Sequence, residues 1–367
     1  MIANFLEHFS EIEDPGYEGF VTYPLPAILL GALIGVICGG EDWEEIALFC
    51  EEKLEVLRQF LPYEKGIPSA KTFWRVFEFL DSQSFATCFA AWIESLVKTV
   101  KGVEAIDGKT LRGAKQGEGQ EKALHVLSAY AHEAGLVIGQ RCVDSKSNEI
   151  TAIPQLLETL AIEGAIVTID AMGTQKAVAQ AILNRKADYV LALKGNQSTL
   201  HDDVRLFFED GKLAETCDTF ATTDAGHGRI EERTCRATED IAWLKERHPD
   251  WQGLCSIVAV TSMRTDKKTG KTTSETRFYI SSMPAKADAL LAATRAHWSI
   301  ENNLHWMLDV LFNEDACQTR KKNAALNLGI VRKTALGLLK RQPTHLPIKR
   351  KIKKASCNND FLLSTLR

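Results

Sequence analysis

Closely spaced cysteine pairs are absent from the sequence. The nine cysteines stand singly, and the nearest two, Cys38 and Cys50, lie 12 positions apart. Zinc fingers and disulfide-rich scaffolds need cysteines at short, repeated spacings, so both classes are excluded. Because the isolated thiols occur without a signal-peptide pattern, we expect a cytoplasmic protein.

The sequence also lacks an uninterrupted apolar run long enough to cross a bilayer. Residues 21–40 carry no charge, but Pro24 and Pro26 break the start of this run. The helix that can form, 27–38, extends ~18 Å at about 1.5 Å per residue, which is short of the ~30 Å hydrocarbon core. We therefore expect a buried core helix and no membrane partner.

Proline is scarce, with 10 residues among 367, while the 24 glycines and the 45% hydrophobic share are ordinary for a globular chain. No internal repeat or low-complexity segment occurs. This composition excludes collagen-like, disordered and coiled-coil chains. At roughly 100–200 residues per domain, the length suits one large domain or a few ordinary ones.

The net charge of −4 conceals an acidic and a basic region. Residues 1–55 contain 12 acids and one lysine, whereas residues 320–354 contain 12 bases and no acid. A basic patch acts over about one Debye length, ~8–10 Å, so the near-neutral total does not exclude a polyanionic partner. We interpret the basic stretch as a phosphate-facing surface, and a solvated helical face is the alternative.

Helical periodicity dominates the first 100 residues. Two short helices joined by a turn can form a DNA-reading helix-turn-helix, but the first of these helices is acidic, which favours a plain helical bundle. The predicted helices are 27–38, 41–60, 70–80 with Ser69 as N-cap, and 85–100 after a cap at Asp81 or Ser82.

Strand patterns alternate with helical ones after residue 101 and predict a mixed sheet flanked by helices. Residues 196–285 interrupt this alternation as a β-rich insertion. The predicted strands are 103–107, 125–132, 136–143, 165–170, 188–194, 228–237, 256–264 and 276–282. The predicted helices are 149–160 with Asn148 as N-cap, 174–185, 287–312 with a break near its end, and 322–339.

Two carboxylates stand at the ends of apolar strands, Asp107 in AIDGKTLRG and Asp170 in TIDAMG. Strand ends face the ligand crevice of open α/β sheets, and a divalent cation balances charge placed there. For each residue alone a structural role is the alternative, because Asp-Gly favours turns and Asp170 can cap the following helix.

Glu301, within HWSIENNLHWMLDVLF, is the candidate for a third acid. His297, Glu301 and His305 share one helical stripe, so a zinc site is an alternative, although HExxH is absent. Three carboxylates instead suit Mg²⁺ or Mn²⁺, and two such ions support phosphoryl transfer. Asp309, Glu314 and Asp315 are nearby acids that compete with Glu301 for this role.

Basic residues accompany these acids and indicate a DNA substrate. Some of these bases follow the acidic motifs in the sequence. Others lie on the inserted hairpin or near the C-terminus. The candidate DNA-binding residues are Lys109, Arg112, Lys194, Arg229, Arg233, Lys267, Lys268, Lys271, His297, Arg320, Lys349, Arg350 and Lys351.

Six motifs occur in one order: AIDGKTLRGA, KSNEITAIPQLL, TIDAMGTQ, DYVLALKGNQ, HGRIEER and HWSIENNLHWMLDVLFNEDACQTR. Together they resemble DDE insertion-sequence transposases of the H-repeat-associated group, over residues 5–345. The resemblance implies an RNase H-like catalytic domain in which Asp107, Asp170 and Glu301 form the catalytic, metal-binding triad. The wider superfamily places Tyr, Arg and Lys around its glutamate, where this sequence has Thr294, His297 and Leu308.

The resemblance implies a bacterial, nucleoid-associated DNA transposase that uses Mg²⁺ or Mn²⁺ as two ions. Its partners would be double-stranded DNA, both terminal inverted repeats and target, and a second copy of the chain when assembled on DNA. An inactive transposase-derived DNA-binding protein and a metal-dependent nuclease without strand transfer are the alternatives. We expect a helical domain at 1–100, the catalytic domain at 101–345 and a basic tail at 346–367.

Overall fold

The computed structural model describes residues 2–10, 12–16, 19, 21–96, 102–114, 123–143, 149–226 and 228–366. The chain divides into two units. One unit comprises Met1–Thr99, Gly108–Asn148 and Glu301–Arg367, and the other comprises Val100–Asp107 and Glu149–Ile300. The predicted N-cap Asn148 lies outside the described residues.

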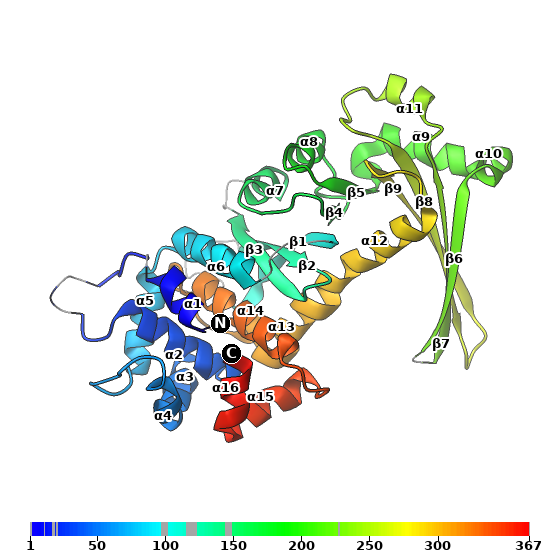
Figure 1. Cartoon of the computed structure of the whole chain (residues 1–367). Helices are drawn as coiled ribbons and strands as arrows, with labels where there is room; N and C mark the ends of the chain where they lie inside the picture. Colours follow the sequence, from blue (N-terminus) through cyan, green and yellow to red (C-terminus); the bar gives the residue numbers. More distant parts are fainter. Residues whose placement is uncertain are drawn as a thin grey trace. The chain divides into compact units, whose positions relative to one another are not determined.

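The first unit is mainly helical (Figure 1). Helix α14 (Ala324–Arg341) packs against α2 (Leu25–Ile37), and every residue of α2 except Pro26 is buried. The uncharged run around α2 therefore forms a core helix, as its length predicted. Among the described residues, no helix combines the length and the apolar character needed to cross a membrane.

The other elements of this unit surround α2 and α14. They are α1 (Ile2–Phe9), α3 (Trp43–Glu52), α4 (Leu54–Leu57), α5 (Ala70–Phe79), α6 (Ser82–Leu96), η1 (Arg112–Ala114), β2 (Leu124–Ala131), β3 (Leu136–Val143), η3 (Glu301–His305), α13 (Trp306–Phe312), η4 (Glu314–Ala316), α15 (Ile348–Cys357) and α16 (Asn359–Leu366).

Local capping explains where several of these helices begin. The Oγ of Ser69 accepts a hydrogen bond from the Thr72 amide, and a carboxylate oxygen of Asp81 accepts one from the Ser84 amide. Both residues lie where the sequence predicted a cap. The predicted helix 41–60 is instead divided at Lys53, whose φ of −107° and ψ of 15° lie outside the helical region.

The basic C-terminal stretch folds as α15 and α16, two helices that the sequence analysis does not predict. Helix α15 contacts α14, α2 and α16. The apolar side chains that dock the pair are buried, and they are Ile352, Ala355, Phe361, Leu362 and Leu366. The predicted tail is therefore part of the folded first unit, because it buries an apolar face.

The second unit contains a mixed sheet with strands in the order β1-β4-β5-β9-β8-β7-β6. Strands β1 (Val103–Leu111), β4 (Ile166–Ile169) and β5 (Asp188–Leu193) are parallel to one another. Strand β9 (Thr272–Ser281) pairs with β5 in the antiparallel sense. Helices flank this sheet, which confirms the α/β class and the mixed sheet expected of an RNase H-like domain.

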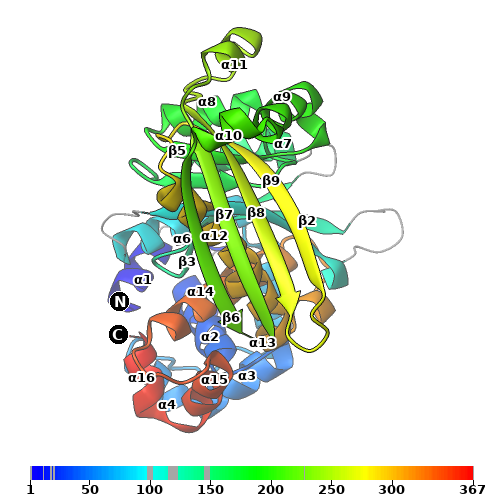
Figure 2. The same ribbon diagram turned by 90° about the vertical axis from the view of Figure 1, so that its right-hand side faces the viewer.

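The insertion contributes four long antiparallel strands that lie side by side (Figure 2). Besides β9, these are β6 (Asp218–Gly226), β7 (Arg229–Thr238) and β8 (Ser256–Asp266). Helix α12 (Ala287–Ile300) packs along them with its buried alanines and leucines. The β-rich insertion is thus confirmed, although its first strand, β6, is absent from the sequence prediction.

Helices complete the second unit, and they too are only partly predicted by the sequence. Helices α7 (Glu149–Glu158) and α8 (Lys176–Asn184) occur where predicted and contact each other. The elements that the sequence analysis does not predict are η2 (Gly195–Gln197), α9 (Ser198–Glu209), α10 (Gly211–Glu215) and α11 (Ala242–Arg247).

Candidate active site

Asp107 and Asp170 occupy equivalent positions on neighbouring parallel strands. The pairing of β1 with β4 runs from Val103 opposite Ile166 to Ile106 opposite Ile169, and each aspartate is the next residue. Neighbouring strands lie about 4.8 Å apart, so the two half-buried aspartates lie side by side where the pairing of β1 with β4 ends. Strand β1 continues to Leu111, which corrects the prediction that it ends at Asp107.

The loop after β4 holds the Asp170 side chain in place. The Gly173 amide donates to an Asp170 carboxylate oxygen at 3.2 Å, and the Thr174 hydroxyl donates to the Asp170 carbonyl at 3.1 Å. Helix α8 begins only at Lys176, with Gln175 before it. Asp170 therefore closes a turn and does not cap the following helix, which corrects that alternative.

His297 attaches α12 to β4. Its Nδ1 lies 3.1 Å from the Thr168 hydroxyl, two residues before Asp170. Burial lowers the pKa of His297, and the nearby charge of Asp170 opposes that shift only in part. The imidazole is therefore neutral at neutral pH, and its Nδ1 is directed at β4.

Glu301 is the first residue of the π-helical turn η3, which directly follows α12 in the chain. Its carboxylate is more than half exposed, and one oxygen lies 3.3 Å from the Nδ1 of His305. Burial lowers the pKa of His305 to about 3, so this imidazole is neutral as well. The Glu301 carboxylate is thus accessible and lies against a buried neutral histidine.

The competing acids in the first unit pair with Lys109. The Lys109 ammonium contacts Asp309 and lies 2.9 Å from a Glu314 carboxylate oxygen. Burial alone would lower the pKa of Lys109, but the charges of Glu314 and Asp309 outweigh it and raise that pKa. Lys109, proposed from the sequence as a DNA contact, is mostly buried in this cluster, and Asp309 and Glu314 are engaged by it.

The other sequence-predicted bases differ in their surroundings. Lys194 is exposed and follows β5, at the same sheet edge as Asp170. Arg233 is largely buried and pairs with Asp224 and Glu231, and Arg229 lies 3.9 Å from Glu231. The exposed side chains at the β8–β9 hairpin tip are Lys267, Lys268 and Lys271.

Two further bases, Arg112 and Arg320, belong to the first unit. Arg112 is exposed, with its Nε 3.8 Å from Asp315, and the Nε of Arg320 donates to the Gly113 carbonyl at 3.1 Å. Both guanidinium groups retain donors for a phosphate.

Helix α15 separates its lysines into an exposed and a buried set. Lys351 is buried, and its ammonium donates to the carbonyls of Leu339 and Gln342 at the end of α14. Its assignment as a DNA contact is therefore corrected, because this ammonium caps a helix. The exposed bases form one face of α15 and are Lys349, Arg350, Lys353 and Lys354.

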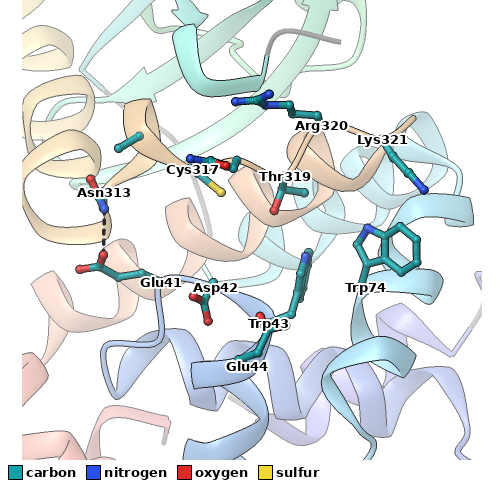
Figure 3. A pocket seen from close by; sticks show the side chains of 12 residues that line it. Glu41, Asp42, Trp43, Glu44, Trp74, Asn313, Cys317, Thr319, Arg320 and Lys321 are labelled. Atoms are coloured by element: carbon teal, nitrogen blue, oxygen red, sulfur yellow. Dashed lines mark hydrogen bonds between the residues drawn. The ribbon is translucent and has the colours of Figure 1, made fainter. Parts of the chain in front are cut away.

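The first unit also contains a cavity of about 620 Å³ that the sequence analysis misses (Figure 3). Trp43, Trp74 and Arg320 are among its lining residues, and the Lys321 ammonium lies 4.6 Å from the centre of the Trp74 ring. The Asn313 amide donates to Glu41 across one side. Carboxylates and cations both line the cavity, so its charge alone selects no ligand class.

The chain matches two family models, one described as DDE_Tnp_1-associated over residues 6–93 and one as Transposase DDE domain over residues 80–338. The chain therefore belongs to the DDE transposase family.

Two relatives are similar over the whole of this chain. "Putative transposase YncI" of Escherichia coli O157:H7 is 38% identical, with 95% of its own length covered. "H repeat-associated putative transposase YhhI" of Escherichia coli strain K12 is also 38% identical, with 98% covered. The resemblance drawn from the six motifs is confirmed.

A solved structure, the piggyBac transposase synaptic complex with hairpin DNA, aligns at 10% sequence identity with a TM-score of 0.45. The alignment covers 99% of this chain and 77% of that one.

Proposed function

We propose that this protein is an active DNA transposase that cuts DNA at the ends of an insertion sequence and joins the freed ends to target DNA. The proposed catalytic residues are Asp107, Asp170 and Glu301. The observation that carries this proposal is the pairing of Asp107 and Asp170 at equivalent positions on β1 and β4. Glu301 is assigned because it follows α12, the helix that His297 attaches to β4.

The carboxylates fit a divalent metal, which the family's chemistry also implies. Asp107 and Asp170 are half-buried acids on neighbouring strands, and two such charges repel unless a cation balances them. Their ligand atoms are all oxygen, which suits Mg²⁺ or Mn²⁺. Two bound ions would supply charge neutralisation at the attacking and leaving oxygens of a phosphodiester.

The proposed reaction consists of two in-line displacements at phosphorus. In the first, a water oxygen attacks the phosphodiester at the element end, the P–O3′ bond breaks, and the leaving oxygen becomes a 3′-OH. In the second, this 3′-OH attacks a target phosphodiester and displaces the target's own O3′. Each step forms one P–O bond and breaks another, so no covalent protein intermediate is required.

The residues around the acids would orient the reacting groups. The Gly173 amide fixes the direction of the Asp170 carboxylate, and His305 does the same for Glu301. His297 is neutral, and its Nδ1 forms a hydrogen bond with the Thr168 hydroxyl. We therefore assign it to holding α12 on the sheet, in place of the phosphate contact that the sequence suggested.

Exposed bases would bind the DNA backbone. Lys194 stands at the sheet edge that carries Asp170. At the tip of the β8–β9 hairpin, an Asp266 carboxylate oxygen accepts from the Lys268 and Thr269 amides, and Gly270 has a φ of +67°. This fixed turn presents three exposed lysines, which suits phosphate contacts without base specificity.

A plasmid assay with the purified chain tests the proposal. With Mg²⁺ and a donor DNA that carries the sequences flanking the gene, we expect cleavage and then joining to a target plasmid. Asp107→Asn and Asp170→Asn should abolish both products while DNA binding remains. Cleavage without joined product would identify a nuclease, and binding without cleavage would identify an inactive relic. Sizing the DNA-bound protein tests the proposed homodimer.

A further inference from the structure

The turn that carries Glu301 departs from regular helix. Residues Glu301–His305 form a π-helical turn between α12 and α13. A π turn contains one residue more than an α turn and is rare unless its surroundings favour it. Since each helical residue turns the chain by about 100°, losing the extra residue would rotate Glu301 relative to one of its flanking helices.

Lys340, near the end of α14, contacts this turn directly. Its ammonium donates to the Asn303 carbonyl at 2.5 Å and to the Tyr130 hydroxyl at 2.9 Å. It also lies 4.9 Å from the centre of the Tyr130 ring. A single cation therefore links the π turn to strand β2 within the first unit.

The hydrogen bond from Lys340 supplies a partner for the Asn303 carbonyl in the π turn. Carbonyl groups in a widened turn lose regular partners along the helix, and a charged donor satisfies such a group better than a neutral one. Lys340 is largely withdrawn from water, and burial lowers its pKa to about 8. A buried ammonium requires partners, so the bond stabilises the turn and the lysine together.

We propose that Lys340 is a positioning residue that maintains the π turn and thereby directs the Glu301 carboxylate toward the divalent metal. This inference rests on the proposed function, because it assumes that Glu301 is a metal ligand. The superfamily lysine expected seven residues after the glutamate is replaced by Leu308, which is fully buried. Lys340 contacts the same helical segment from α14, because its ammonium binds the backbone carbonyl of Asn303.

Lys333 provides a matched control on the same helix. Its ammonium is also buried and donates to the Ser128 hydroxyl at 3.0 Å and to the side-chain amide oxygen Oε1 of Gln140 at 2.5 Å. Burial lowers its pKa to about 8 as well. Removing Lys333 therefore disturbs a comparable buried cation on the β2–β3 hairpin, without removing the bond to Asn303.

The test measures Mn²⁺ binding to the full chain by calorimetry, without DNA. Lys340→Met should weaken the affinity by roughly tenfold, the lower limit typical for partners of metal ligands. The Mn²⁺ affinity of Lys333→Met should remain within about twofold of wild type, although its melting temperature should fall by a similar amount. Lys340→Arg keeps the positive charge and should retain much of the wild-type affinity. Amide hydrogen exchange at residues 302–305 should increase only in Lys340→Met.

Glu301→Gln separates the two proposals. If it leaves Mn²⁺ affinity and cleavage unchanged, the proposed function fails. A second outcome is that Glu301→Gln weakens Mn²⁺ binding while Lys340→Met and Lys333→Met have equal Mn²⁺ affinities. That result would overturn the positioning role of Lys340 and leave the proposed function intact. Should Lys340→Met not fold, Tyr130→Phe removes the hydroxyl partner and keeps the ring. A smaller loss of affinity is expected there, and wild-type affinity with wild-type exchange would contradict the inference.

Discussion

Substituting Gly173 by alanine tests how the structure fixes Asp170. A Cβ at this position would clash with the Cγ2 of Ile169 and lie 2.7 Å from the Cδ1 of Ile153. Both isoleucines are buried, so neither can move freely. Overpacking of this kind costs about 1–3 kcal/mol, and we expect Gly173→Ala to lower the free energy of unfolding by that amount.

The same substitution should affect catalysis beyond its effect on stability. The Gly173 amide holds an Asp170 carboxylate oxygen, so a shift of the loop moves the carboxylate. Domains are typically stable by about 5–15 kcal/mol, so the variant remains folded. Because a displacement of about 1 Å can cost ~100-fold in rate, we expect cleavage at saturating Mg²⁺ to fall by roughly 10–100-fold.

Gly195→Ala is the matched control, because a Cβ there meets no atom within 4 Å. Urea denaturation and a single-turnover cleavage assay are applied to both variants. Gly195→Ala should stay within about 0.5 kcal/mol of wild type. Wild-type stability and rate in Gly173→Ala, or equal destabilisation of the two variants, would refute the reasoning.

Three further predictions concern metal, DNA and pH. Cleavage should require Mg²⁺ or Mn²⁺, and zinc that copurifies stoichiometrically and is lost on substituting His297 and His305 would contradict the oxygen-ligand site. Replacing the four exposed bases of α15 by glutamine should reduce the slope of log K against log salt by about 0.9 per lost phosphate contact. Lys351→Met should reduce stability with that slope unchanged, and an unchanged slope in the quadruple variant would show that α15 does not touch DNA. The pKa of His305 is lowered by burial to about 3, against about 6.5 in the unfolded chain. At pH values between these two pKa values, the imidazole is protonated in the unfolded chain and neutral in the folded one. The free energy of unfolding should therefore fall as pH drops from about 6.5 toward 4, by up to ~1.4 kcal/mol per pH unit. His305→Gln should flatten this decline, and equal slopes in the two proteins would exclude the histidine as its source.

Elements with strong local signals were predictable from the sequence. Ser69 and Asp81 mark helix starts through their own side chains, and the run AIVTID predicts a strand because its residues are apolar and β-branched. The equivalent placement of Asp107 and Asp170 follows from two such strands becoming parallel neighbours. Each of these features depends on a few adjacent residues, so the local sequence is sufficient to predict it.

Other features depend on tertiary contacts that no local pattern encodes. Strand β6 is exposed along nearly all of its length, so it lacks the apolar alternation that identifies a strand. The charged α15 docks through Ile352 and Ala355 only because α16 and α14 lie against it. Likewise Lys351 and Lys109 read as surface bases in the sequence, and their burial follows from partners far along the chain.

Single-turnover cleavage by Glu301→Gln tests the central claim most directly. The substrate is a duplex carrying the DNA that flanks the gene, and Mg²⁺ and enzyme are both saturating. The substitution removes one negative charge at a half-exposed position, so the fold and the DNA affinity should remain. The account predicts no detectable cleavage, and a wild-type rate would contradict the assignment of Glu301 as the third catalytic acid.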